Sequence, residues 1–326
     1  MIKVVGIGAP VMDLLIHTKS VPAANGFSQL EECSWQGGGK VTSALAALGR
    51  LGVETGIVGV IGNDLYGKFQ LEDFKRHRVD TSRLAIDPEG ETPFCICLSD
   101  QETQGRSFIA RKSILRSMTL EDLDREYITQ GRYIHLAHMD PIIRQAALWA
   151  REKGIGVVFD ADRYQEAIAQ NYDVIDVFIA SEFYYRTVFG DDADYERNCR
   201  AIREKGPGIV VFTFGEHGCL GVHGDSFFRL PAFSVPVMDT TGAGDVFHGA
   251  FIYGLLQGWG VEETARFSSA VSAVKCTRVG GRAGIPDVPT VERFLKDGTI
   301  DYTEIDRRVA FYRKRIFEIK QEVECK

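Results

Sequence analysis

The sequence predicts an α/β protein with a doubly wound, mostly parallel sheet flanked by helices and a small β-strand lid. Three observations support this fold class. Short apolar runs alternate with helical segments along most of the 326 residues, which is typical of buried parallel strands joined by helices. Residues 15–36 and 92–111 instead resemble extended or alternating, half-buried strands. A loop of small residues, Asp239–Asp245, leads directly into a long apolar helix.

The composition is that of an ordinary soluble globular protein, with 44% hydrophobic and 25% charged residues. The net charge of -7 offers no basic surface for nucleic acid or an anionic membrane. The seven cysteines are scattered without a C-x-x-C pair, which argues against structural zinc and a disulfide framework. Because the N-terminus lacks a signal-like segment and no 18-residue apolar run occurs, we expect a cytoplasmic protein that binds neither nucleic acid nor membrane.

The first strand is expected at residues 2–8. It ends in glycines, but the third glycine of a dinucleotide-binding G-x-G-x-x-G motif would fall on Val11, so that motif fails. Asp13 follows this strand, where open α/β sheets bind ligands. Residues 15–36 are then expected as two extended segments joined by a turn at residues 21–26.

A triple glycine at residues 37–39 precedes Lys40 and an Ala/Leu-rich helix over residues 41–48, which Thr42 or Ser43 could cap. Three glycines allow a ligand to approach the backbone closely, and a flexible hinge is the alternative. For Lys40, the alternative to a ligand contact is an exposed loop lysine.

Beyond this helix we expect a strand over residues 53–60, a turn at 62–67 and a helix that extends to about Val79. Residues 92–111 have the pattern of a hairpin with its turn at residues 100–105. The predicted division places residues 1–14, 37–91 and 112–326 in the large domain and residues 15–36 and 92–111 in the lid.

From residue 119 onward, strands are predicted at residues 133–137, 156–160, 174–180 and 209–213, with helices between them. The tail, residues 303–326, is predicted to be a C-terminal amphipathic helix that packs on its own domain, with a coiled coil as the alternative. Its apolar residues recur at spacings of four and three: Ile305, Val309, Tyr312, Ile316, Ile319 and Val323.

The loop at Asp239–Asp245 is the strongest functional candidate. Small residues before a helix N-terminus present free N–H groups and the positive end of the helix dipole, and both favour an anion. Asp245 is the first acidic residue beyond the loop. A carboxylate in that position is chemically useful as a base that accepts a proton from a nucleophile attacking the anion; the alternative is an N-terminal cap.

Together these segments resemble the ribokinase (PfkB) family of carbohydrate kinases. Asp239–Asp245 resembles the C-terminal signature of that family, and the Gly38-Gly39 loop with its helix resembles the N-terminal signature. The other matching segments follow in the family's order and extend the resemblance over most of residues 1–290: Asp13, Gly62-x-Asp64-x-x-Gly67, the hairpin at 100–108 and Gly215-x-x-Gly218.

The resemblance implies transfer of the ATP γ-phosphoryl group to a hydroxyl of a sugar or sugar derivative, with a nucleoside as the alternative acceptor. It implies that Asp245 is the base and that the backbone N–H groups of Gly242, Ala243 and Gly244 stabilise the phosphoryl oxygens. It places the substrate at Asp13, Gly38, Gly39, Lys40 and Ser43. It places the nucleotide at Ser181, Thr213, Gly215, Gly218, Thr241 and Ser269.

The hairpin carries Arg106, Arg111 and Lys112, which are candidates to meet an acidic group of the substrate or are ordinary surface charges. Family lids often pair between subunits, so the resemblance also implies a homodimer through the lid. It further implies a monovalent-cation site, for K⁺, at the carbonyls around Asp239, Thr241, Arg278 and Gly280.

Several positions depart from the family pattern. Ser43 stands where asparagine is usual. The motif Asn-x-x-Glu appears as Ser181-Glu182-Phe183-Tyr184 and lacks the carboxylate that orders Mg²⁺. Either the ATP phosphates hold Mg²⁺ with help from Glu182 or Asp160, or the protein has lost much of its transfer activity and is a ligand-binding regulatory protein.

Within the family, residues 239–286 look closest to sulfofructose kinase. Phe27 and Ala110, however, stand where sulfonate-binding polar residues are expected. This part of the resemblance therefore does not predict the substrate.

Overall fold

In the computed structural model, which describes residues 1–111 and 113–313, the main sheet has nine strands in the order β13-β12-β11-β10-β9-β8-β1-β4-β5. The strands from β11 to β5 are parallel, and β12 and β13 add an antiparallel hairpin at one edge. The strands are β1 (Val4–Ile7), β4 (Thr55–Gly62), β5 (Val79–Asp87), β8 (Tyr133–Leu136), β9 (Gly156–Ala161), β10 (Val177–Ser181), β11 (Ile209–Thr213), β12 (Cys219–His223) and β13 (Ser226–Leu230).

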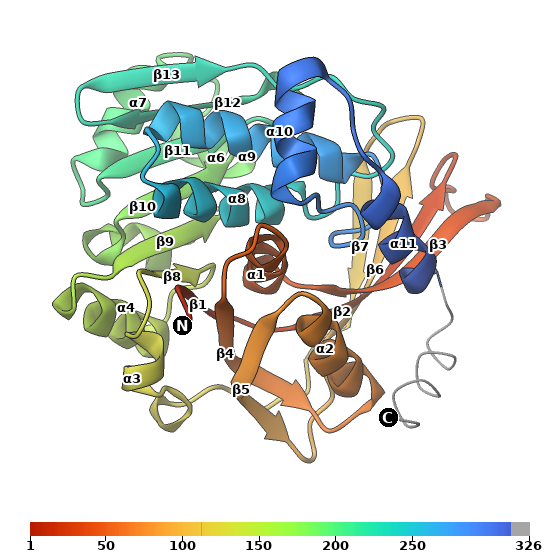
Figure 1. Ribbon diagram of the computed structural model, residues 1–326, viewed down its shortest axis with the longest axis horizontal. Helices are drawn as coiled ribbons and strands as arrows, with labels where there is room; N and C mark the ends of the chain where they lie inside the picture. The colour runs from red at the N-terminus through yellow and green to blue at the C-terminus, as the bar shows by residue number, and fades with distance from the viewer. Residues whose placement is uncertain (112, 314–326) are drawn as a thin grey trace.

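Helices cover both faces of this sheet (Figure 1). Adjacent residues of β1 show the alternation: Val4 belongs to the apolar cluster that includes residues of α1, α8 and α9, and Val5 belongs to the cluster on the other face, which includes residues of α4 and α7. The helices are α1 (Lys40–Arg50), α2 (Leu65–Arg76), α3 (Arg125–Ile128), α4 (Pro141–Glu152), α5 (Glu166–Ala169), α6 (Glu182–Phe189), α7 (Tyr195–Arg203), α8 (Ala243–Gln257), α9 (Val261–Cys276), α10 (Val288–Asp297) and α11 (Thr303–Tyr312), with 3-10 turns η1 (Leu120–Asp122), η2 (Tyr172–Val174) and η3 (Gly215–His217).

The two alternating segments form a separate four-stranded sheet in the order β3-β2-β6-β7, which projects beside the helical layer (Figure 1). Its strands are β2 (Val11–Thr18), β3 (Leu30–Gly38), β6 (Phe94–Asp100) and β7 (Arg106–Ala110). The second sheet therefore begins earlier than expected, since Val11 already pairs with Gly38. Asp13 consequently lies within β2 rather than in a loop after the first strand.

Three local expectations were wrong. The helix expected to reach Val79 ends at Arg76, because Arg78 has a φ of 59° and Val79 starts β5 by pairing with Thr55. The strand predicted at residues 174–180 starts later, at Val177, because residues 172–174 form η2. Neither Thr42 nor Ser43 caps α1: Gly39 is the N-cap, and the Thr42 hydroxyl donates back to the carbonyls of Gly38 and Gly39.

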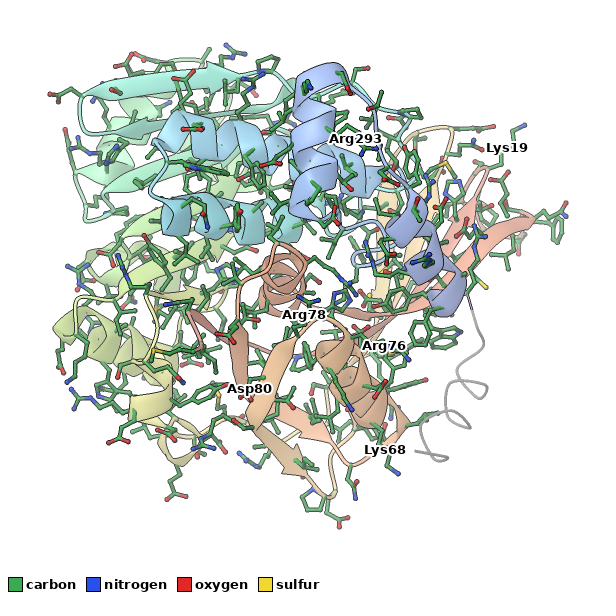
Figure 2. All side chains as sticks on the ribbon, in the orientation of Figure 1. Lys19, Lys68, Arg76, Arg78, Asp80 and Arg293 are labelled. Carbon is green, nitrogen blue, oxygen red and sulfur yellow. The ribbon has the colours of Figure 1, made fainter. Side chains whose placement is uncertain are left out.

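The described part of the tail, α11, packs against its own chain. Ile305, Val309 and Tyr312 of α11 are buried in a cluster with α9 and α10. Arg76 of α2 lies beside this helix (Figure 2), with its guanidinium carbon 3.8 Å from the centroid of the Phe311 ring. The remaining stripe residues, Ile316, Ile319 and Val323, fall outside the described residues. Among the residues described, no helix is long and apolar enough to cross a membrane.

Candidate active site

The loop before α8 is held in a fixed shape. Gly242 has a φ of 74°, in the left-handed region that favours glycine, and a Cβ there would lie 2.8 Å from the Gly281 Cα. The Asp239 carboxylate accepts hydrogen bonds of 2.8 Å from the backbone N–H groups of Thr241 and Gly280. These contacts tie the loop to the turn after α9, so the helix N-terminus is preorganised for an anion.

Of the three backbone N–H groups expected to donate to the anion, the structure leaves two free to do so among the described residues. The Ala243 N–H donates to the Thr240 carbonyl at 3.1 Å, which corrects the expectation that it faces the anion. The N–H groups of Gly242 and Gly244 have no acceptor among the described residues. Gly242 and Gly244 therefore present the N–H groups that a phosphoryl oxygen could use.

Asp245 lies in the first turn of α8, directly after these donors. Burial and the negative charge of Asp160 raise the pKa of Asp245 to about 7, although the Lys40 ammonium opposes the shift. A carboxyl with a pKa near neutrality can accept a proton and release it again at physiological pH. This is the property expected of a general base, and a simple helix cap does not require it.

Lys40 is part of the same cluster rather than a free loop lysine. Its ammonium lies 3.3 Å from the Asp162 carboxylate. Burial lowers the pKa of Lys40, but the carboxylates of Asp160, Asp162 and Asp245 outweigh it and leave that pKa above its ordinary value. The ammonium is thus held as a fixed positive charge next to the candidate base.

Two buried histidines, which were not anticipated from the sequence, lie beneath this cluster. His248 Nε2 is 3.5 Å from the Asp160 carboxylate, and the ring centroid of His135 is 5.5 Å from that of His248. Burial lowers the pKa of both histidines to about 3, so both are neutral. The sequence signal that could have identified His248 is its place one turn after Asp245 on the same face of α8.

The glycine loop, residues 37–39 at the end of β3, contacts Asp13 of the second sheet. A side chain at Gly38 would overlap with the Asp13 carboxylate, so this close approach requires glycine. Burial raises the pKa of Asp13 to about 7, and the charge of Asp245 contributes to the shift. Ser43 is buried in the first turn of α1 behind the loop, and Gly39 caps that helix. The predicted substrate residues Asp13, Gly38, Gly39 and Ser43 therefore lie together.

The glycine loop is supported from behind by Arg282, which the sequence did not identify. This fully buried guanidinium pairs with Asp73 and donates to the Gly38 carbonyl at 3.0 Å. The Tyr312 hydroxyl of α11 donates to the same Asp73 carboxylate. Residues far apart in the sequence thus fix the backbone that packs on Asp13.

The hairpin arginines divide into two groups. Arg106 Nη1 donates to both the carbonyl and the hydroxyl of Thr240 at 2.9 Å. The second sheet therefore contacts the loop at residues 239–245, which we call the anion loop. Arg111 instead pairs with Glu91, and this ion pair is half-exposed. Lys112 lies outside the described residues. Arg106 is the hairpin cation that the structure brings to the site.

The expected nucleotide residues other than Thr241 gather near the carboxyl ends of β10 and β11: Ser181, Thr213, Gly215, Gly218 and Ser269. Thr213 of β11 pairs with Ser181 of β10 on one side and with Cys219 of β12 on the other. Gly215 and Gly218 lie in the turn at η3, which joins β11 to β12. The Cys219 sulfur is 3.7 Å from the Ser269 hydroxyl. Carboxyl ends of parallel strands are where open α/β sheets bind nucleotides.

Residues 1–288 match the pfkB family of carbohydrate kinases. The chain belongs to this family. It is similar to 5-dehydro-2-deoxygluconokinase of Clostridium perfringens, at 27% identity over 83% of this chain and 87% of that protein. Ribokinase of Lactococcus lactis is 26% identical (91% and 98% covered), and a nucleoside kinase of Methanothermobacter thermautotrophicus is 24% identical (88% and 94% covered). The protein is therefore a sugar or nucleoside kinase of the pfkB family.

Solved structures of pfkB kinases have the same fold. Arabidopsis thaliana ribokinase complexed with ribose and ATP superimposes with a TM-score of 0.77 at 21% identity, covering 91% of this chain and 99% of that one. A putative ribokinase II from E. coli in complex with ATP and Mg²⁺ has a TM-score of 0.78 at 20% identity, with 91% and 99% covered. These similarities confirm the ribokinase-like fold that the sequence predicted.

The altered Asn-x-x-Glu motif of this pfkB kinase has a structural explanation. Tyr184 is fully buried in the apolar cluster of the main domain, where its hydroxyl hydrogen-bonds with that of Tyr172. Ser181 caps α6 and donates to the Asp162 carbonyl. Glu182 pairs with Arg186 at 3.1 Å. The tyrosine therefore fills the core, and a glutamate introduced at position 184 would be buried there.

The expected K⁺ ligands already have a cation. Lys275 Nζ donates to the Asp239 carbonyl at 2.9 Å and to the Thr241 carbonyl. At the other two expected positions, the Gly280 N–H donates to Asp239 and the Arg278 guanidinium donates to Asp306 at 2.8 Å, and neither contact involves the backbone carbonyl. The carbonyls of Asp239 and Thr241 thus do not fit a bound metal ion in this chain.

Proposed function

We propose that this pfkB kinase transfers the γ-phosphoryl group of ATP to a hydroxyl of a small sugar or sugar acid. The observation that carries the proposal is Asp245, a carboxyl of near-neutral pKa in the first turn of α8, whose charge acts on the Asp13 carboxyl that packs against Gly38. Two relatives are named for sugar or sugar-acid phosphorylation, and two similar structures are described with ATP.

The chemistry follows from the placement of charges. Asp245 accepts the proton of the acceptor hydroxyl while the oxygen of that hydroxyl forms a bond to the γ-phosphorus. The bond between this phosphorus and the bridging oxygen breaks at the same time, and ADP is released. Gly242 and Gly244 donate their N–H groups to the charged phosphoryl oxygens. Lys40 supplies a positive charge beside the base. Asp13 accepts hydrogen bonds from hydroxyls of the substrate.

Mg²⁺, when bound with ATP, offsets the negative charge of the phosphates. The residues that fit it are Asp160 and Asp162, because Mg²⁺ prefers oxygen ligands and usually keeps several waters. Both carboxylates lie beside Lys40 and within the electrostatic influence of Asp245. Of the two candidates from the sequence, Asp160 belongs to this pair, and Glu182 is engaged with Arg186.

The second sheet acts as a lid over the acceptor. Arg106 of β7 joins it to Thr240 of the anion loop, so closure would complete the positive surroundings of the phosphoryl group and exclude water.

The test is a screen for ADP release with a panel of sugars, sugar acids, polyols and nucleosides. Turnover of sugars or sugar acids is the expected result. Turnover of nucleosides alone would replace the sugar proposal with a nucleoside kinase. Specific ligand binding without ATP consumption on any acceptor would point to a ligand-binding regulatory protein.

We also propose a homodimer formed through the lid. The lid exposes several large apolar residues, namely Phe27, Leu30, Phe108 and Ile109, and β7 is an edge strand of its sheet. Light scattering should give twice the mass of 36.2 kDa, and Phe108→Ser should shift the population toward monomer. A monomeric wild-type protein at all concentrations would exclude the dimer.

A further inference from the structure

Lys275 occupies an unusual position for a lysine. It lies in the last turn of α9, and its side chain is fully buried. Lysine is almost never fully buried unless it is paired, because its charge must be compensated. Here the compensation comes from backbone carbonyls. The Nζ atom donates hydrogen bonds to the carbonyls of Asp239 and Thr241, both in the first half of the anion loop. The carboxyl-terminal end of α9 adds a favourable dipole.

This contact orients the donors of the anion loop. The carbonyl and N–H of one peptide unit point in opposite directions, because the unit is planar and trans. A Thr241 carbonyl directed at Nζ therefore directs the Gly242 N–H away from it. That N–H has no acceptor among the described residues and is one of the two donors of the loop. Lys275 thus holds the loop in its anion-binding geometry from the buried side.

We propose that the Lys275 ammonium replaces a monovalent metal cation in this kinase, so that phosphoryl transfer does not depend on K⁺. The proposal rests on the proposed kinase function. An ammonium and K⁺ carry the same charge and both are satisfied by carbonyl oxygens. Nζ is already at hydrogen-bond distance from Asp239 O, so a metal ion could not use the same two carbonyls. Lys275 is a positioning residue, since it acts through the loop.

The first experiment compares wild-type enzyme in KCl and in tetramethylammonium chloride at equal ionic strength. We expect the two rates to agree within about twofold, which is smaller than the loss caused by removing one anion-stabilising donor. Activation of the wild-type enzyme by K⁺ of about tenfold or more would overturn the proposal.

Substitution of Lys275 should create a response to cations. Lys275→Ala removes the charge and opens space, so we expect a loss of about 100-fold in kcat without K⁺ and recovery of at least tenfold with K⁺ or NH₄⁺. Lys275→Met removes the charge but fills the space, so its loss should not be recovered. Lys296→Ala, at an exposed lysine in the last turn of α10, is the control and should behave as wild type in both salts. Full activity of Lys275→Ala without K⁺ would contradict the proposal.

A readout without substrate separates this proposal from the kinase assignment. K⁺ should raise the melting temperature of Lys275→Ala relative to tetramethylammonium, because an ion that binds only the folded state stabilises it. The wild-type protein should show no such difference. If the alanine variant does not fold, wild-type crystals soaked in Tl⁺ still decide the question. An anomalous peak between the carbonyls of Asp239 and Thr241 would refute the proposal, and no peak there would support it.

Discussion

Two carboxyl groups with raised pKa values, Asp13 and Asp245, share the site with Lys40. Burial is the main cause of both shifts, and the charge of Asp160 adds to the shift at Asp245. Since Asp245 must be ionised to accept a proton, activity should fall as the pH drops through its raised pKa of about 7.

Asp160→Asn tests this electrostatic account. Removing the neighbouring negative charge lowers the pKa of Asp245, so the acidic limb of the kcat/KM profile should move to lower pH. The measurement is the pH–rate profile of both proteins over pH 5 to 9. An acidic limb that stays in place or moves upward would show that Asp160 does not set the ionisation of the base.

Tyr184 provides a second prediction at the scale of one residue. Tyr184→Phe removes a buried hydrogen bond to Tyr172 and should lower the free energy of unfolding by about 1 kcal/mol. The Mg²⁺ concentration for half-maximal rate should not change, since the side chain lies in the core. Urea denaturation and an Mg²⁺ titration measure the two quantities. Tyr164→Phe, which loses an exposed hydrogen bond to Glu166, is the matched control. A changed Mg²⁺ concentration for half-maximal rate would show that the side chain at position 184 does affect Mg²⁺ binding.

At the scale of elements, α11 is connected to the substrate loop through Asp73. Tyr312→Phe leaves a buried carboxylate oxygen without its donor, and we expect a loss of about 1–3 kcal/mol in the free energy of unfolding. Arg307→Ala on the same helix breaks only an exposed pair with Glu304 and should cost less than about 0.5 kcal/mol. Equal effects of the two substitutions in urea denaturation would mean that α11 is not anchored through this network.

The sequence predicted elements well where a strong local pattern exists. The buried strands β8, β9 and β11 and both segments of the second sheet follow from apolar runs and alternation. Strand β5 was missed because Asp80, Ser82 and Arg83 interrupt any simple pattern and the strand follows α2 without a glycine or proline. The β12–β13 hairpin was missed because its two strands have only five residues each and neither alternates strictly between buried and exposed positions.

The site shows the same division. Asp245, the glycine loop and Asp13 could be identified from sequence because small residues and carboxylates mark them locally. Lys275 and Arg282 could not, because their roles depend on contacts with Asp239 and Asp73 that are distant in the sequence. Burial of a charged side chain becomes visible only when the tertiary structure is known.

At the scale of the whole molecule, the second sheet is connected to the anion loop through Arg106 and Thr240. If the second sheet closes over the substrate, backbone hydrogen exchange of residues 15–36 and 92–111 should slow when a sugar that the enzyme phosphorylates binds. The β12–β13 hairpin, at the far edge of the main sheet, is the internal control and should not change. Identical exchange with and without sugar would show that the second sheet is not a lid.

The central claim is that Asp245 accepts the proton of the acceptor hydroxyl. Asp245→Asn keeps the size of the side chain but cannot take up that proton. Isothermal titration should give nearly unchanged sugar affinity, and thermal unfolding above pH 7 should show no loss of stability, since the ionised form of a carboxyl with a raised pKa opposes folding. The decisive quantity is kcat on the sugar found in the screen. We predict a fall of at least about 100-fold, and a variant that keeps a tenth of the wild-type kcat would contradict the assignment.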